Sequence, residues 1–209
     1  TSIASEIEGK TAMTLLSKPI TRRQFVLGKY IGILQTALAL LIPLMIVFCF
    51  FIFYKVGYDA RESSKEVPEW WDSATMIPNT ARLQEVLHVL PGFALIFLEI
   101  AVVSAISVAI STRAPMVVNM TSCLAIFAVG HLTPTLVEAG VLQIEIVDFM
   151  ARLIATVMPN LESFSMSTAA STDKVIPPFY LLAALGYAVV YAGAAILLSF
   201  ILFEDRDLA

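Results

Sequence analysis

Charged residues are scarce in this sequence, and their scarcity excludes a soluble protein. Only 14% of the 209 residues are Asp, Glu, Lys or Arg, whereas 58% are hydrophobic and the mean hydropathy is +0.84. A soluble domain carries about 25% charged residues. The chain also has no basic run and a net charge of -4, so it lacks the pattern that binds the phosphate backbone of nucleic acid. We therefore expect an integral membrane protein with no nucleic-acid partner.

Cysteine and histidine are also rare, with two of each in the chain. Cys49 and Cys123 fall inside apolar stretches, where a thiol is more often a small hydrophobic group than a disulfide partner or a metal ligand. His88 and His131 show no HExxH-like spacing. The sequence thus predicts neither a metal centre nor a cofactor.

Long apolar blocks dominate the sequence instead. Each block is about as long as the roughly 20 residues that an α-helix needs to cross the hydrocarbon core of a bilayer. None shows the alternation of polar and apolar residues that is typical of a membrane β-strand. These features predict an all-α membrane protein, a bundle of four transmembrane helices at residues 31–54, 89–111, 117–137 and 179–203.

The connections between these blocks differ in length and character. Only residues 112–116 join the second and third blocks, so these two spans should form an antiparallel hairpin. Residues 55–88 contain many charged residues and the adjacent Trp70 and Trp71, which predicts a water-exposed loop with an aromatic pair at the level of the lipid headgroups. Pro43 predicts a kink in the first span.

An amphipathic helix is expected between the third and fourth blocks. On a helical wheel, residues 142–158 place their charged side chains on one face and their apolar side chains on the other. Pro159 and Asn160 would end this helix. We expect it to lie at the membrane interface, or to re-enter the membrane, before the last span.

The start of the first membrane helix carries a recognisable N-terminal signal. Thr21 and Gln24 have the spacing of a capping box, in which each side chain can bond the backbone amide of the other residue. Ile20 and Phe25 flank this box at the positions of a hydrophobic staple. These four residues predict a helix that begins at Arg22 and continues into the first apolar block.

A shorter helix is expected before this one. Pro19 would end it, because the residue before a proline is disfavoured in the α conformation. Within residues 3–17, the side chains of Ile3, Ile7 and Leu15 form one apolar row. The sequence therefore predicts a short amphipathic helix that lies outside the bilayer.

Basic residues next to the spans indicate the orientation of the chain. Arg22, Arg23 and Lys29 adjoin the first span, and Arg113 lies in the short turn between the second and third spans. Lys and Arg near span ends favour the cytoplasmic side. We therefore expect a multi-pass protein of the plasma (inner) membrane with both termini in the cytoplasm.

Glu99 is the residue that fits its surroundings least, because it lies in the middle of the second span. A charged carboxylate at that depth costs about 3 kcal/mol. Two explanations remain open: a contact with substrate or proton on a pathway, or an interhelical hydrogen bond, which is the more common. His131, deep in the third span, could pair with Glu99 or with Ser104.

Residues 6–32 carry a dense set of motif residues ahead of the first span. They are Glu6, Glu8, Gly9, Thr11, Leu15, Leu16, Ser17, Pro19, Arg22, Arg23, Gly28 and Lys29. Their order resembles the cytoplasmic segment of ABC-2 type transporter permeases. Residues 158–164 (MPNLESF) and the end of the last span at 203–208 (FEDRDL) are similar to the same family.

The resemblance implies a permease subunit of an ATP-driven exporter, which works with an ABC ATP-binding subunit and a second permease subunit. Such permeases usually have six spans, so we expect the first two to be missing from this chain. The resemblance also implies that residues 1–30 form a cytoplasmic coupling segment ahead of a transmembrane domain at residues 31–209. The coupling residues that it indicates are Ile3, Glu6, Ile7, Glu8, Thr11, Leu15 and Leu16.

One short motif could suggest that this chain hydrolyses ATP itself. Gly9, Lys10 and Thr11 spell the end of a P-loop, but Ala4 stands where that motif needs a glycine. ATP hydrolysis is therefore expected on a partner chain. The competing hypotheses are a scaffold or assembly factor that transports nothing and an intramembrane enzyme, and co-purification of an ATP-binding protein would separate the exporter from both.

Overall fold

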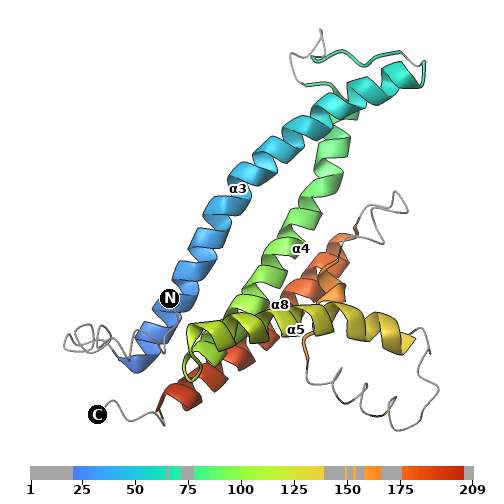
Figure 1. Ribbon diagram of the computed structural model, residues 1–209. Coiled ribbons are helices and arrows are strands. Elements are labelled where there is room, and N and C mark those ends of the chain that lie inside the picture. The colour runs from blue at the N-terminus through green and yellow to red at the C-terminus, as the bar shows by residue number, and fades with distance from the viewer. Residues whose placement is uncertain are drawn as a thin grey trace.

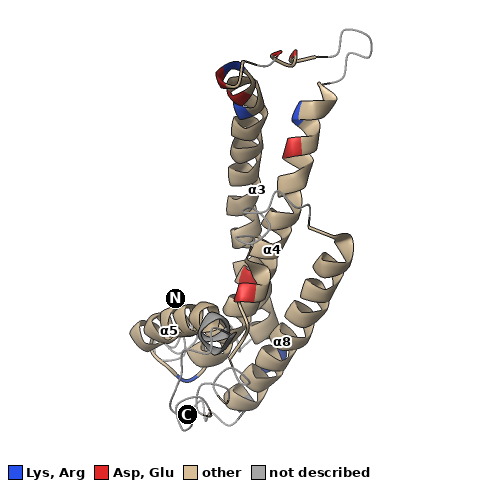
Figure 2. Ribbon diagram, turned by 90° about the vertical axis from the view of Figure 1, so that its right-hand side faces the viewer, with Lys and Arg blue, Asp and Glu red and all other residues tan. Residues whose placement is uncertain are grey.

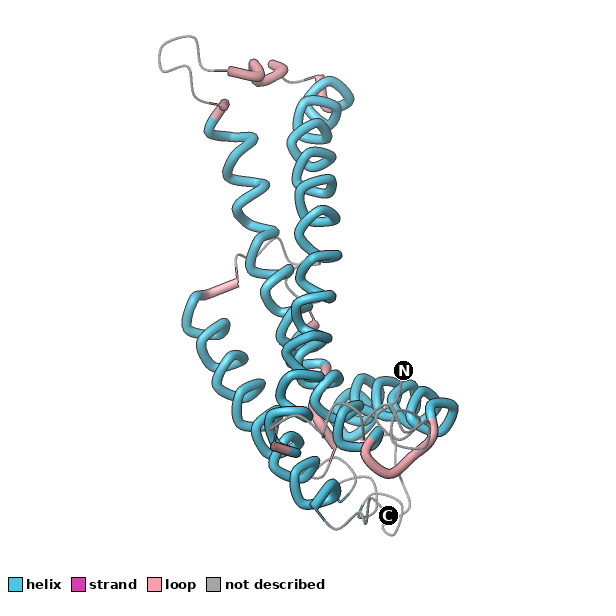
Figure 3. Tube along the Cα trace, turned by 90° about the vertical axis from the view of Figure 1, so that its left-hand side faces the viewer, coloured by secondary structure: helices cyan, strands magenta, loops and turns pink. Residues whose placement is uncertain are grey.

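The computed structural model describes residues 21–64, 66–71, 78–138, 149, 153, 158–165 and 176–204. These residues form helices and connecting segments without any strand, which confirms the predicted all-α fold class (Figure 3). The elements are α3 (Arg22–Glu62), α4 (Thr80–Ser111), α5 (Met116–Glu138), the short 3-10 helix η1 (Glu162–Phe164) and α8 (Pro178–Glu204).

Three of these helices are long and apolar enough to cross a membrane, namely α3, α4 and α8. They contain the predicted spans at residues 31–54, 89–111 and 179–203. Helix α5 coincides with the remaining predicted span, and the part of it searched for apolar character is Met116–Leu132. That α5 crosses the membrane as well stays a prediction.

The long helices meet at two ends of the molecule. Helix α3 runs from one end to the other, α4 returns beside it, and α8 packs against the half of α4 that leads to its C-terminus (Figure 1). We call the end around Arg22, Ser111 and Phe203 the base, and the end around Glu62 and Thr80 the tip. Most of the charged residues drawn in Figure 2 lie toward these two ends, which leaves the helices between them almost uncharged.

The capping box at the start of α3 forms as predicted. The Gln24 amide donates to Thr21 Oγ1 at 3.3 Å, and the Thr21 amide donates to Gln24 Oε1 at 2.9 Å. Helix α3 begins at Arg22 for this reason. Ile20 lies outside the described residues, and Phe25 stacks on Phe203 of α8 with ring centroids 6.1 Å apart.

The base is held together by contacts among all three long helices. Val26 of α3, Val108 of α4 and Phe203 of α8 are buried in one hydrophobic cluster. Arg22 Nη1 donates to the carbonyl oxygen of Phe203 at 3.4 Å, and Arg113 Nε donates to that of Leu202 at 3.1 Å. Two cations therefore bond the last carbonyls of α8, where the helix dipole favours positive charge.

The loop at the tip is shorter than the predicted loop over residues 55–88. Helix α3 continues to Glu62, and an ion pair at 3.7 Å between Lys55 and Asp59 bridges one of its last turns. Helix α4 begins at Thr80, where the Asn79 side chain caps it by accepting from the Ala81 amide at 3.0 Å. Local pairing and capping thus extend both helices beyond their apolar blocks.

Helix α5 does not form the predicted antiparallel hairpin with α4. The connection is short, as expected, but α5 runs crosswise to α4 in two perpendicular views (Figures 1 and 2). Near the turn the two helices are joined by Asn119 Nδ2, which donates to Ser107 Oγ at 3.1 Å. Farther along, α8 and residues 158–165 occupy the surface of α4. The short helix η1 contacts both α4 and α5, so it fills part of the space between them as they diverge from the turn.

A buried arginine of α4 holds the tip together by binding α3 and the connecting segment. Arg82 is only 1% exposed, and its guanidinium donates to the carbonyl oxygens of Phe53 at 2.7 Å and Pro68 at 2.8 Å. It also lies over the rings of Phe53 and Trp70, at 5.2 and 5.0 Å from their centroids. A side chain on Gly57 would collide with the guanidinium. Residues 66–71 are thereby tied to both α3 and α4.

Replacing Arg82 with Ala should destabilise the tip by roughly 2–4 kcal/mol, since hydrogen bonds from a cation and two ring contacts are lost. Trp70 and Trp71 are the only tryptophans in the chain, so tryptophan fluorescence during denaturation reports on this end. Lys55→Ala is the matched control, because that exposed ion pair should contribute no more than about 0.5 kcal/mol. Equal unfolding midpoints for the two variants would contradict the role given to Arg82.

Candidate functional site

Residues 158–165 form a segment that contains the 3-10 helix η1 but no α-helix, and it packs against three helices. Leu161 and Phe164 are 0% and 1% exposed. They join one hydrophobic cluster with side chains from the apolar middle of α4 and from α8. The other buried members of this cluster are Leu95, Val102, Ile176, Ala184 and Ala188. The segment therefore packs its buried residues against the apolar parts of α4 and α8, while Asn160 is exposed.

The backbone of this segment bonds its neighbours at several points. The Leu161 amide donates to the Gly130 carbonyl oxygen of α5 at 3.2 Å, and the Asn160 amide donates to the hydroxyl of Tyr187 of α8 at 2.8 Å. The hydroxyl of Tyr180 donates to the Ser163 carbonyl oxygen. Irregular backbone at membrane depth is tolerated where protein groups satisfy it. Helices α5 and α8 supply those groups here.

Gly130 allows the close approach of α5 to this segment. A Cβ at that position would lie 2.8 Å from the Pro159 carbonyl oxygen and 2.9 Å from Leu161 Cγ, both closer than ordinary van der Waals contact. Glycine thus sits mid-helix for a packing reason, although it is a poor helix former. This contact could not be predicted from the glycine itself, because Gly186 and Gly193 are also helical glycines and have open space beside them.

The structure brings Glu99 and His131 together, as the sequence suggested. Glu99 Oε1 lies 3.5 Å from His131 Nε2, and the two side chains are 15% and 28% exposed. The other ring nitrogen, Nδ1, lies 3.2 Å from the Phe127 carbonyl oxygen. The Phe127 ring also contacts the imidazole, with centroids 4.6 Å apart. The alternative partner, Ser104, is buried in α4.

The serines of α4 do not form a polar path together. Ser107 bonds Asn119 of α5, whereas Ser111 Oγ donates to the Val108 carbonyl oxygen one turn earlier in its own helix. Ser104 is one of the small residues in the buried face of α4. These contacts fit close packing between helices.

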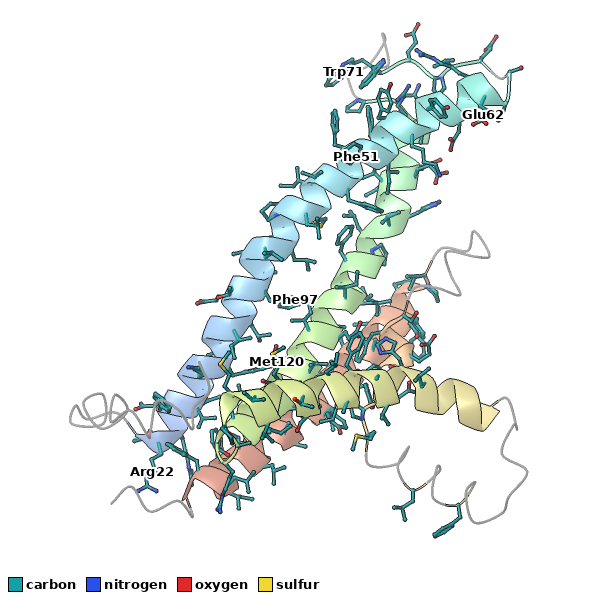
Figure 4. All side chains as sticks on the ribbon, in the orientation of Figure 1. Arg22, Phe51, Glu62, Trp71, Phe97 and Met120 are labelled. Carbon is teal, nitrogen blue, oxygen red and sulfur yellow. The ribbon has the colours of Figure 1, made fainter. Side chains whose placement is uncertain are left out.

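Several predicted features lie outside the described residues. The coupling candidates belong to this group: Ile3, Glu6, Ile7, Glu8, Thr11, Leu15 and Leu16. Of the predicted amphipathic helix at residues 142–158, the described Phe149 and Leu153 are helical and exposed, and the described Met158 is not helical. The structure does place the start of α3, with Arg22 at the base (Figure 4).

An apolar groove runs between α3 and α4 in the half of the molecule near the tip. Its volume is about 960 Å³, and its lining includes Phe48 and Phe51 of α3 and Gly92 and Phe93 of α4. Lys55 lies at its rim and is already paired with Asp59. The groove thus offers apolar surface with little means of orienting a polar ligand.

Comparison with known proteins gives one match. A protein-family model described as "ABC-2 family transporter protein" matches residues 1–208. No curated protein and no solved structure matches the chain.

Gly130→Ala should loosen residues 158–165, because the added methyl group would collide with Pro159 and Leu161. We expect a loss of roughly 1–3 kcal/mol in unfolding free energy, typical of an overpacked contact. Gly193→Ala is the matched control, since open space and better helix propensity should leave it neutral or stabilised by up to about 1 kcal/mol. Denaturation midpoints in lipid provide the measurement, and equal stability of both variants would argue against this contact.

Proposed function

This chain belongs to the ABC-2 transporter family, and on that premise we propose that it is the permease subunit of an exporter driven by ATP. It is a multi-pass membrane protein and a transporter subunit. In the proposed complex, ATP is hydrolysed by a separate ATP-binding subunit on the cytoplasmic face. The observation that carries the proposal is the match of the family over residues 1–208, which includes the proposed coupling segment.

The coupling segment is proposed to be the contact with the ATP-binding subunit. Its apolar row, Ile3, Ile7 and Leu15, would bury itself in that partner, while Glu6, Glu8, Thr11 and Leu16 complete the surface. A few buried side chains usually supply most of the binding energy of such an interface. The helix predicted over residues 3–17 would end before Pro19, shortly ahead of the capping box of α3.

The base is proposed to transmit motion from this contact to the spans. Helix α3 has 41 residues and is therefore a rod of about 60 Å, continuous through Pro43. Its first turns are joined to α8 by Arg22 and Phe25, which both contact Phe203. Val26 packs with Val108 of α4 in the same cluster. A displacement at Thr21 would therefore move the ends of all three long helices.

The base is proposed to face the cytoplasm. Arg22, Arg23 and Arg113 lie at this end, and basic residues beside span ends favour the cytoplasmic side. The tip, with Glu62 and Trp71, would then face the outside (Figure 4). This orientation puts both termini in the cytoplasm of a plasma (inner) membrane protein and puts the coupling segment where ATP is available.

A second permease subunit is the other proposed partner. None of the most apolar 18 residues of α3 is buried within the chain. Exposed apolar side chains on α3 include Leu40, Leu44 and Phe51. Lipid can cover such a surface, and a second copy or a related permease would use the same surface to enclose a pathway between two subunits.

The Glu99–His131 pair is proposed to be an interhelical polar contact in this permease. It joins the middle of α4 to α5, which otherwise meet near the turn. Glu99→Gln retains the shape and hydrogen-bonding capacity of the side chain, so transport and expression should both stay normal. Loss of transport at unchanged expression would instead place Glu99 on the pathway. A transport assay with expression measured in parallel separates the two outcomes.

Exchanging Ile7 or Leu15 for Asp should abolish retention of the ATP-binding subunit, because an unpaired charge would enter an apolar contact at a cost of several kcal/mol. The spans are satisfied internally, so the subunit should still reach the membrane in normal amounts. Ser5→Asp is the control, since Ser5 lies on the opposite side of the helical wheel. The measurements are co-purification of the ATP-binding subunit and stimulation of its ATPase activity. Full stimulation by both the Ile7→Asp and the Leu15→Asp subunits would remove the support for this segment as the coupling element.

Labelling of single cysteines tests the orientation. With Cys49 and Cys123 replaced by Ala, a cysteine at Ser63, which caps the exposed end of α3, should react with a membrane-impermeant thiol reagent in intact cells. A cysteine at Asp205 should react only after the membrane is opened. The reverse pattern would place the base outside and exclude the proposed docking surface.

A further inference from the structure

The apolar groove between α3 and α4 changes in character along its length. At the end away from the tip it is lined by Leu44 of α3 and Ile96 of α4, which are both exposed. At the end near the tip its lining includes Lys55 and Tyr58 of α3. The volume of about 960 Å³ is within the range of ligand sites. A matching occupant has an apolar part along most of the groove and a polar part at the tip.

The groove has about the depth of one membrane leaflet. Its lining on α3 runs from Leu44 to Tyr58, which is about 21 Å at a rise of 1.5 Å per residue. A bilayer with its headgroup regions is about 40–45 Å thick, so one leaflet is roughly 20–22 Å. Tyrosine and tryptophan favour the headgroup level. The exposed Tyr54 and Trp70, with ring centroids 6.3 Å apart, mark that level beside the polar end of the groove.

The polar end of the groove carries one charge of each sign. Lys55 Nζ lies 3.7 Å from Asp59 Oδ2, and both side chains are more than half exposed. On a helical wheel, Asp59 lies between Lys55 and Ile52, which both line the groove. An exposed pair of this kind is weak, so each charge can bind a further partner. One cation beside one anion complements a zwitterionic phospholipid headgroup, which carries a phosphate and an amine.

A second copy of the chain is the alternative occupant, and the same charges disfavour it. An apolar helix over the groove would remove Lys55 and Asp59 from water without giving them new partners, and the desolvation of such a pair is costly. A lipid headgroup leaves the pair hydrated. Other exposed side chains of α3, such as Ile46 and Phe50, do not line the groove and stay available to a second subunit.

We propose that this groove binds one zwitterionic phospholipid of the leaflet at the tip. An acyl chain lies against Phe48 and Phe93, whose rings contact each other with centroids 5.7 Å apart, and ends near Ile96. The phosphate binds the ammonium group of Lys55, and the headgroup amine binds the carboxylate of Asp59. The lipid thereby contacts both α3 and α4. This site requires no ATP-binding subunit, so it stands or falls separately from the proposed function.

Lipid retention by the whole chain tests the site. The protein is extracted into detergent from nanodiscs that contain equal amounts of phosphatidylethanolamine and phosphatidylglycerol, and native mass spectrometry identifies the lipid that stays bound. We expect one phosphatidylethanolamine per chain, preferred roughly two- to fivefold because phosphatidylglycerol has no amine for Asp59. Asp59→Asn should still bind a lipid but should lose the preference.

A pair of matched variants locates the retained lipid. Ile96→Trp places an indole in the groove and should abolish retention. Ile46→Trp makes the same change at an exposed position of α3 outside the lining, and it should retain the lipid as the wild-type chain does. Equal retention by the two variants, or a wild-type chain without preference for phosphatidylethanolamine, would overturn the proposal.

Photolabelling of the wild-type chain decides the question if Ile96→Trp does not fold. Phosphatidylethanolamine with a photoactivatable group at the end of an acyl chain should attach near Leu44 and Ile96. Labels confined to other surfaces would show that the groove holds no lipid. A dimer that excludes the label from both residues would show that a second copy covers the groove, and it would overturn the proposal as well.

Discussion

The structure depends on one constraint, which is that backbone polar groups at membrane depth must be satisfied by the protein itself. Helices α3, α4 and α8 satisfy most of theirs internally. Residues 158–165 are not a regular α-helix, so their amides and carbonyls bond Gly130 of α5 and Tyr180 and Tyr187 of α8. The position of α5, and with it the Glu99–His131 contact, follows from this requirement.

Backbone carbonyl oxygens are also satisfied by arginine side chains at both ends of the molecule, and the two ends hold different helices together. At the base, Arg22 and Arg113 bond the last carbonyls of α8 and bring the ends of three long helices together beside the proposed coupling segment. At the tip, Arg82 bonds carbonyl oxygens of Phe53 and Pro68 and closes the α3–α4 pair. The tip joins α3 to α4, and the base joins α3, α4 and α8. These two connections would let the proposed permease move α3 and α4 together when the base is displaced.

Local signals were readable from the sequence, and most tertiary contacts were not. Hydropathy located the spans within α3, α4 and α8, and the spacing of Thr21 and Gln24 gave the start of α3, because these features depend on neighbours within one helix. Glu99 and His131 stood out because charge is costly at that depth, which made their pairing foreseeable. The crosswise α5 and the buried Arg82 depend on residues distant in sequence, and no periodicity encodes such partners.

Amide hydrogen exchange in a lipid bilayer tests the central claim most directly, namely that residues 158–165 are held at membrane depth by protein groups. The amides of Asn160, Leu161 and Phe164 all donate to protein acceptors, so we expect them to exchange about 100-fold more slowly, or slower still, than the amides of Glu66, Val67 and Glu69 at the tip. Their protection should approach that of α8. Exchange as fast as at the tip would show that this segment lies in water and would contradict the account.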